Sequence, residues 1–139
     1  MMTQPDETRP PEDQTAMAAG DRLRRELLIS GLYDMVPLIQ VEQVITRNDL
    51  AETLPAQQDL ALRTIRSLVE DGLMEIGGLP GPGEKFPAWN LSIDAAMERV
   101  YDRFVRHYDN PTLWEFHIWL NLTDSGRRIA KAPEAKAAD

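Results

Sequence analysis

The residues best suited by type and spacing to do chemistry lie in LRTIRSLVEDGLMEIG, residues 62–77. This stretch is typical of a helix, a glycine stop and a strand. Helices in this setting can bind DNA, because arginine, serine and threonine side chains contact phosphates and base edges in a groove. The candidate nucleic-acid-binding residues of this helix are Arg63, Thr64, Arg66 and Ser67.

The same helix also has a purely structural interpretation. Asp59 stands four residues before Arg63. Glu70 stands four residues after Arg66, so each arginine has an acidic neighbour one helical turn away on its own helix. The alternative to a reading face is therefore a solvated, salt-paired face.

Two further groups of basic residues lie near the ends of the chain. They are Arg22, Arg24 and Arg25 in the first predicted helix, and Arg127, Arg128 and Lys131 in the last. If the two groups meet in space they form a patch that could contact a phosphate backbone. Otherwise they are dispersed charges that keep the surface solvated.

Aromatic residues supply the candidate protein-binding site. Alternation along a predicted strand places Trp119 and His117 on its outer face. Either the closing helix or the inserted helix covers that face, or Trp119 joins Trp89 and the loop 78–89 in an exposed platform rimmed by acids. A platform of this kind suits protein recognition, in which tryptophan and tyrosine dominate the energetics.

Catalytic signals are weak. The two histidines, His107 and His117, lack the spacing of metal ligands, and cysteine is absent. The loop GGLPGPGEK resembles a phosphate cradle only superficially, because its prolines remove amide donors and the GK[ST] ending is missing. Ser125 has no evident base. We therefore expect no enzyme activity, no metal and no cofactor.

Composition favours a soluble, cytoplasmic domain. The 139 residues are 42% hydrophobic, which supports a core, and no apolar run is long enough to cross a bilayer or form a secretory signal. The net charge is −8, and most of the excess acid lies within residues 21–126. Such a globule repels a polyanion, so nucleic acid is disfavoured as a partner and a membrane is not expected.

The predicted elements form one domain. Residues 1–20 are predicted to be a disordered leader, residues 21–131 a single domain and residues 132–139 a flexible tail. Three helices are expected over 21–35, 37–46 and 56–71, and a closing helix from Thr123 or Asp124. Two strands are expected over 73–79 and 114–123, the second with Trp114, Phe116, Ile118, Leu120 and Leu122 facing inward.

A further helix is expected between these two strands, over 92–109, with Ser92 as its cap. Its apolar residues form one stripe that must bury against another part of the protein: Ile93, Ala96, Met97, Val100, Tyr101, Phe104 and Tyr108. Packing on the core of its own domain is the simplest outcome, although packing across a dimer stays open.

Two stretches resemble a winged helix-turn-helix domain. ALRTIRSLVEDGLMEIG is similar to the third helix running into the first wing strand, and LNLTDSGRRIA to the return strand turning into a closing helix. The whole chain also resembles small uncharacterised actinobacterial proteins of this type, which implies no activity. The resemblance implies a mostly helical α+β fold: a three-helix core and a small antiparallel sheet. Here a helix is inserted between the wing strands, where a normal wing is a tight hairpin.

Two functions follow as expectations. The first is a non-enzymatic, acidic, winged-helix-like module that binds protein or itself, as an adaptor, a regulator, or an inhibitor or immunity-type partner of a basic protein. The second is a DNA-binding transcriptional regulator that uses Arg63 and Arg66, with Arg127 and Arg128 on the DNA backbone.

Overall fold

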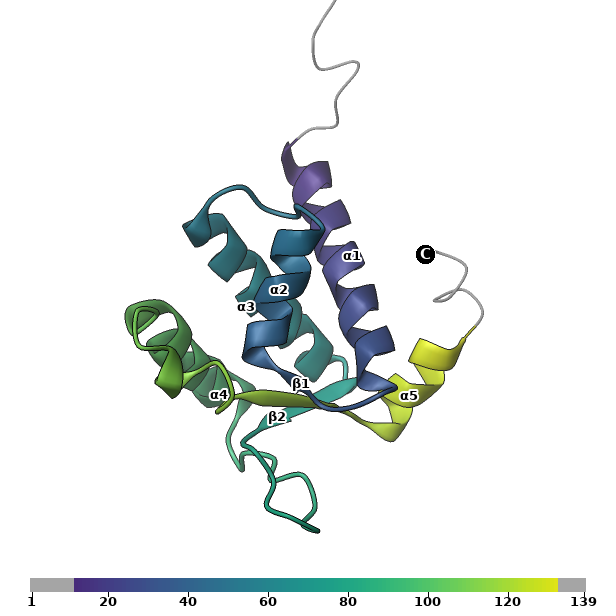
Figure 1. The fold of residues 1–139 in the computed structure, drawn as a ribbon. Coiled ribbons are helices and arrows are strands. Elements are labelled where there is room, and N and C mark those ends of the chain that lie inside the picture. Colours follow the sequence, from purple (N-terminus) through teal and green to yellow (C-terminus); the bar gives the residue numbers. More distant parts are fainter. Residues whose placement is uncertain (1–11, 133–139) are drawn as a thin grey trace, which may run out of the picture.

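The computed structural model describes residues 12–132, which form a mostly helical α+β fold (Figure 1). The helices are α1 (Glu12–Gly31), α2 (Leu38–Arg47), α3 (Leu54–Glu70), α4 (Ile93–Tyr101) and α5 (Asp124–Lys131). The strands are β1 (Val36–Pro37), β2 (Met74–Gly77) and β3 (Trp119–Leu122). No helix in this part of the chain is both long and apolar enough to cross a membrane.

The three strands form one antiparallel sheet in the order β1-β3-β2, so the last strand in the sequence lies in the centre. Leu120 is opposite both Val36 and Ile76. These three side chains are buried and face α1, α2 and α3, which lie together on one side of the sheet (Figure 1). The helices and the inner face of the sheet therefore enclose a single core.

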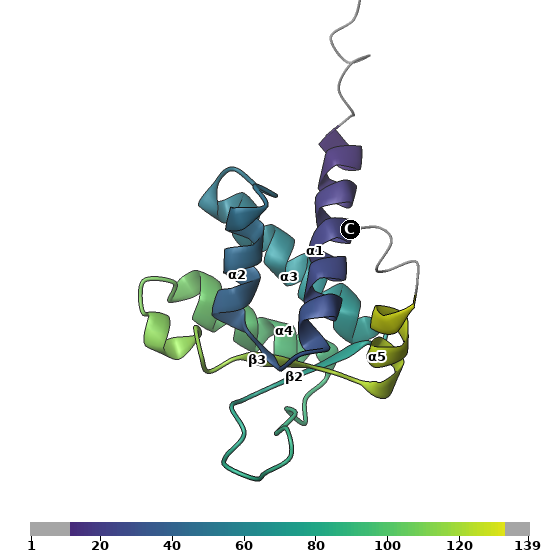
Figure 2. The same cartoon turned by 45° about the vertical axis from the view of Figure 1, so that its right-hand side comes forward.

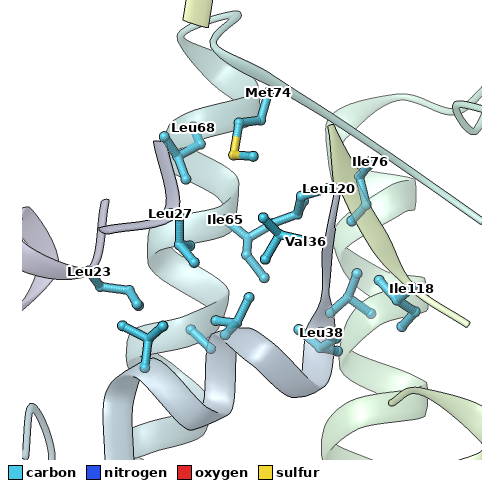
Figure 3. Packing of buried hydrophobic residues seen from close by; sticks show 14 of the residues in the cluster. Leu23, Leu27, Val36, Leu38, Ile65, Leu68, Met74, Ile76, Ile118 and Leu120 are labelled. Atoms are coloured by element: carbon cyan, nitrogen blue, oxygen red, sulfur yellow. The ribbon is translucent and has the colours of Figure 1, made fainter. Parts of the chain in front are cut away.

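The core is aliphatic at its centre. Leu27 of α1 and Ile65 of α3 are fully buried beside Val36 and Leu120 (Figure 3). Each side chain of this size contributes about 1.5–3 kcal/mol when it is fully removed from water. Helix α4 packs on α3, and its Ala96, Met97 and Val100 are buried. The inserted helix thus extends the core of its own chain, as the simplest interpretation of its apolar stripe required.

The first helix begins at Glu12 rather than at Asp21. Residues 12–20, predicted to belong to a disordered leader, are helical. The stretch EDQTAMAA contains strong helix formers and no proline, and this propensity outweighs its polar composition. The remainder of the predicted leader, residues 1–11, and the tail residues 133–139 lie outside the described residues.

The second predicted strand is much shorter than 114–123. Residues Pro111–Leu113 form a 3-10 turn, and the strand begins only at Trp119. The amide of Glu115 donates to the Pro111 carbonyl at 2.9 Å, which continues the turn past Trp114. Alternation does not hold in a turn. Phe116, predicted to face inward, is 54% exposed, whereas Trp114 is 2% exposed.

The predicted helix 92–109 also ends early. Ser92 caps it as expected, since its hydroxyl accepts a hydrogen bond from the Ala95 amide at 3.1 Å. Regular helix stops at Tyr101 and continues as a π-helical turn, Asp102–Arg106. This turn places Phe104 against Tyr108 and Trp114 in one aromatic cluster.

Candidate functional site

The outward face of α3 is salt-paired. Arg63 Nε lies 2.7 Å from Asp59 Oδ2 on the same helix. Arg66 lies 3.1 Å from Glu70 and 2.7 Å from Asp94, which belongs to the first turn of α4. The hydrogen bond to Asp94, followed by the one to Glu70, raises the pKa of Arg66 above its ordinary value. Both arginines predicted to read DNA thus have carboxylate partners.

The two hydroxyl residues of the same candidate set are also engaged. Thr64 is only 4% exposed, so it faces the interior and not a groove. Ser67 accepts a hydrogen bond from Arg24 of α1, and the same guanidinium lies 2.7 Å from Asp71 at the end of α3. The structure therefore leaves Arg63, Arg66 and Ser67 on the surface of α3, between α1 and α4, and turns Thr64 toward the interior.

The basic residues near the two ends of the chain have different neighbours. Arg22 donates to Asn48 at the end of α2 at 2.9 Å, and Arg24 is directed to α3. Arg127 and Arg128 are exposed on α5, which packs on α1 and β3, and Arg128 donates to Ser125 at 3.1 Å. Arg22 and Arg24 therefore do not join α5 in the predicted patch.

Trp89 and Trp119 lie on opposite faces of the sheet. Gly77 pairs with both Trp119 and Ala88, so the side chain of Trp119 shares a face with Ala88, and the next residue, Trp89, faces the other way. Trp89 is partly buried against the core, and the Arg99 guanidinium of α4 lies 4.6 Å from its ring centroid. Trp89 therefore belongs to the packing of α4 and not to a platform with Trp119.

The face of the sheet that carries Trp119 is called here the outer face. It comprises the outward strand positions Pro37, Glu75, Gly77, Trp119 and Asn121, with Phe116 at its edge. Neither α4 nor α5 covers it: in both views α1, α2, α3 and α4 lie on the other side of the sheet, α5 lies beyond its end, and the loop after β2 extends below (Figures 1 and 2). Of the three predicted protein-binding residues, Trp119 lies on this face, half-buried, and His117 is exposed just before β3.

Phe116 and Trp119 form a pair at this edge. Their ring centroids lie 6.3 Å apart, and the Trp119 indole N–H donates to the Phe116 carbonyl at 2.7 Å. Pro37, opposite Trp119 in the register, is buried. Phe116 is the residue that sequence reasoning missed. Asn110-Pro111 is a turn signal just before the predicted strand. If the turn is extended past Phe116, the strand starts later and Phe116 is no longer expected to face inward.

The loop after β2 is held close to the outer face at Gly77. A Cβ at this position would lie 2.3 Å from the Pro87 carbonyl oxygen, so only glycine permits the approach. The Gly78 amide donates to Pro87, and the Trp89 amide donates to Ile76 at 2.9 Å. The loop backbone thereby protects the otherwise open edge of β2.

The described residues contain no group of three or more histidine and acidic side chains able to hold a metal ion. Within the same part of the chain, every buried side-chain nitrogen and oxygen has a hydrogen-bond partner. Comparison of the chain with protein-family models, curated proteins and solved structures found no match. The candidate sites are the outer face of the sheet and the salt-paired face of α3.

Proposed function

We propose that this protein is a non-enzymatic, winged-helix-like module that binds another protein through the outer face of its sheet. The fold part of the proposal is supported by the order of the elements. A helix, a short strand and two helices are followed by two strands, and the later of these is central in the sheet. This order agrees with the resemblance of residues 61–77 and 120–130 to a third helix, wing strands and closing helix.

The observation that carries the binding proposal is the Phe116–Trp119 pair. Exposed aromatic surface is costly to leave in water, and aromatic side chains are enriched at the centres of protein interfaces. Phe116 is 54% exposed on a sheet face that no described helix covers. With a net charge of −8, the chain would attract a basic protein, as an adaptor, regulator or inhibitor of that partner would require.

DNA binding through α3 has weaker support. To contact DNA, Arg63 or Arg66 must break its ion pairs with carboxylates. Asp59, Glu70 and Asp94 would then lie near the DNA phosphates and repel them. The ion pairs of α3 thus favour protein over DNA as the partner.

Site-directed photocrosslinking tests the proposal. A photoreactive phenylalanine analogue at Phe116 of the full chain, expressed in the source cells, should give a discrete adduct with one protein. The same analogue at Leu54, which is 39% exposed at the start of α3, is the matched control. A discrete adduct confined to Phe116 supports the proposal. The absence of an adduct at Phe116, or the same adducts from both positions, contradicts it.

A further inference from the structure

We infer that the outer face binds an arginine-bearing segment of its protein partner, with Glu75 as the acceptor of the arginine. This inference rests on the proposed function and adds the chemistry of the partner. Glu75 is the single charged residue among the outward strand positions, which are otherwise proline, glycine, tryptophan and asparagine. It is half-buried on the edge strand β2.

The carboxylate of Glu75 is held but not neutralised. The Asn121 side-chain amide, directly opposite in the register, donates to Glu75 Oε2 at 3.1 Å. No arginine or lysine of residues 12–132 forms an ion pair with Glu75, although Arg63 and Arg66 of α3 both pair with acids. A half-buried carboxylate with one neutral donor retains the capacity to accept a charge-assisted hydrogen bond.

The spacing of Glu75 and Trp119 fits a guanidinium. Trp119 lies opposite Gly77 and Asn121 opposite Glu75, so Glu75 and Trp119 are diagonal neighbours on adjacent strands. Such neighbours are about 7–8 Å apart, within reach of one long side chain. Arginine can stack its plane on an aromatic ring and direct its N–H fork at a carboxylate, whereas lysine offers a single point charge.

The chain already uses arginine–tryptophan stacking on the other side of the sheet. The Arg99 guanidinium lies 4.6 Å from the ring centroid of Trp89, and that of Arg103 lies at 5.9 Å. On the outer face, Trp119 and Glu75 offer an aromatic ring and a carboxylate on adjacent strands. An arginine from a partner would complete the arrangement.

Charge favours an arginine-bearing protein partner over a second copy of this chain and over a nucleic acid. A second copy of the chain would bring another net charge of −8 and would place two Glu75 carboxylates against each other. A nucleic acid would place phosphates on Glu75. The described chain also begins and ends on the helical side, away from the outer face (Figures 1 and 2).

The test uses the full chain and three synthetic peptides in which leucine alternates with arginine, lysine or citrulline, the neutral isostere of arginine. Binding is measured by isothermal titration calorimetry and by shifts of the Trp119 indole N–H resonance. The arginine peptide should bind and shift this resonance. Citrulline and Glu75→Gln should each weaken binding about tenfold, the equivalent of one charge-assisted hydrogen bond.

Glu52→Gln is the matched control, because it removes the same charge from an exposed position just before α3. It should change the affinity by less than about twofold, since exposed charges at a distance are screened. Equal affinity for the citrulline peptide, or equal effects of Glu75→Gln and Glu52→Gln, would overturn the inference.

A second variant separates this inference from the proposed function. If Phe116→Ser abolishes the photocrosslinked adduct, formed with the analogue at His117, while Glu75→Gln leaves it unchanged, the face binds protein without arginine recognition. The arginine inference is then overturned and the proposed function stands. If neither substitution changes the adduct, both are overturned. Circular dichroism melts of the two variants establish that each is folded.

Discussion

Arg66 of α3 and Asp94 of α4 are joined by a hydrogen-bonded ion pair of 2.7 Å. Asp94 lies in the first turn of α4, where a negative charge also interacts favourably with the helix dipole. The inserted helix therefore gives Arg66 a second acidic partner beside Glu70. The third helix and the insertion share one neutralised surface.

This pairing predicts that the protein does not bind DNA. At about 100 mM salt, mixed genomic fragments should show no change in fluorescence anisotropy, because the acids beside both arginines repel phosphate. Arg63→Ala and Arg66→Ala should give the same result as the parent chain. Salt-sensitive binding that both substitutions abolish would instead establish α3 as a reading helix.

Trp114 and Phe116 should differ sharply in their contributions to stability. Trp114→Ala removes a buried ring that stacks on Tyr108 at 5.2 Å and contacts Phe104 edge-on at 4.9 Å. It should cost about 3–5 kcal/mol of unfolding free energy in urea titrations. Phe116→Ala should change this free energy by no more than about 0.5 kcal/mol, as for an exposed position. Similar losses for both would mean that Phe116 is packed in the core.

Two glycine-to-alanine substitutions should change the free energy of unfolding in opposite directions. A Cβ at Gly126 would lie 1.9 Å from the Leu73 carbonyl oxygen, so alanine must push α5 away from the residue that precedes β2. We expect a loss of about 1–3 kcal/mol, as for other overpacked positions. A Cβ at Gly20 in α1 fits without a clash, because the nearest atom would lie 4.0 Å away. Alanine at this position should raise the free energy of unfolding by about 0.5–1 kcal/mol through its higher helix propensity. Thermal melts of both variants measure the contrast, and a stabilising Gly126→Ala would contradict the close packing.

The Tyr108 hydroxyl should lose its proton at a higher pH than an ordinary tyrosine. Burial, followed by its hydrogen bond to Glu42, raises the pKa of Tyr108 from 10.0 to about 12. The folded state thus holds this proton more tightly than the unfolded state. The resulting stabilisation is fully present below pH 10 and is lost as the pH rises through 12.

Ultraviolet titration of tyrosinate measures this shift. Tyr108→Phe should remove the last component of the titration, and Glu42→Gln should lower the pKa of that component, because the neighbouring negative charge is gone. A parent titration curve that Tyr108→Phe leaves unchanged at its alkaline end would contradict the assignment.

Helices with long apolar stripes could be predicted from the sequence. The second and third helices were predicted to within two residues at each end, and Gly72 ends α3 at φ +73 as a left-handed stop. Thr123 caps α5 as one of two predicted candidates, since it accepts from the Gly126 amide at 3.0 Å. Local propensity and capping decide these features, and both are visible in a short window of sequence.

Features defined by distant partners could not be predicted. Strand β1 has two residues, too few for any period, and it exists because it pairs with β3. The exposure of Phe116 and the separation of Trp89 from Trp119 depend on where β3 begins and on a bridge between Gly77 and Ala88. The outward placement of Trp119 was predicted, because it lies inside the part of the strand where alternation holds.

The central position of β3 affects the order in which the chain can fold. Both β1 and β2 have residues 119–122 as their partner strand, so during synthesis neither strand can join the sheet until those residues leave the ribosome. Up to that moment α1, α2 and α3 can associate, but the apolar inner side of β1 and β2 stays open to solvent and to other chains. Closure of the loop between Gly77 and Trp119 then completes the sheet, and contacts of this sequence separation form slowly. A nascent chain of this protein is therefore exposed to aggregation until its final strand emerges.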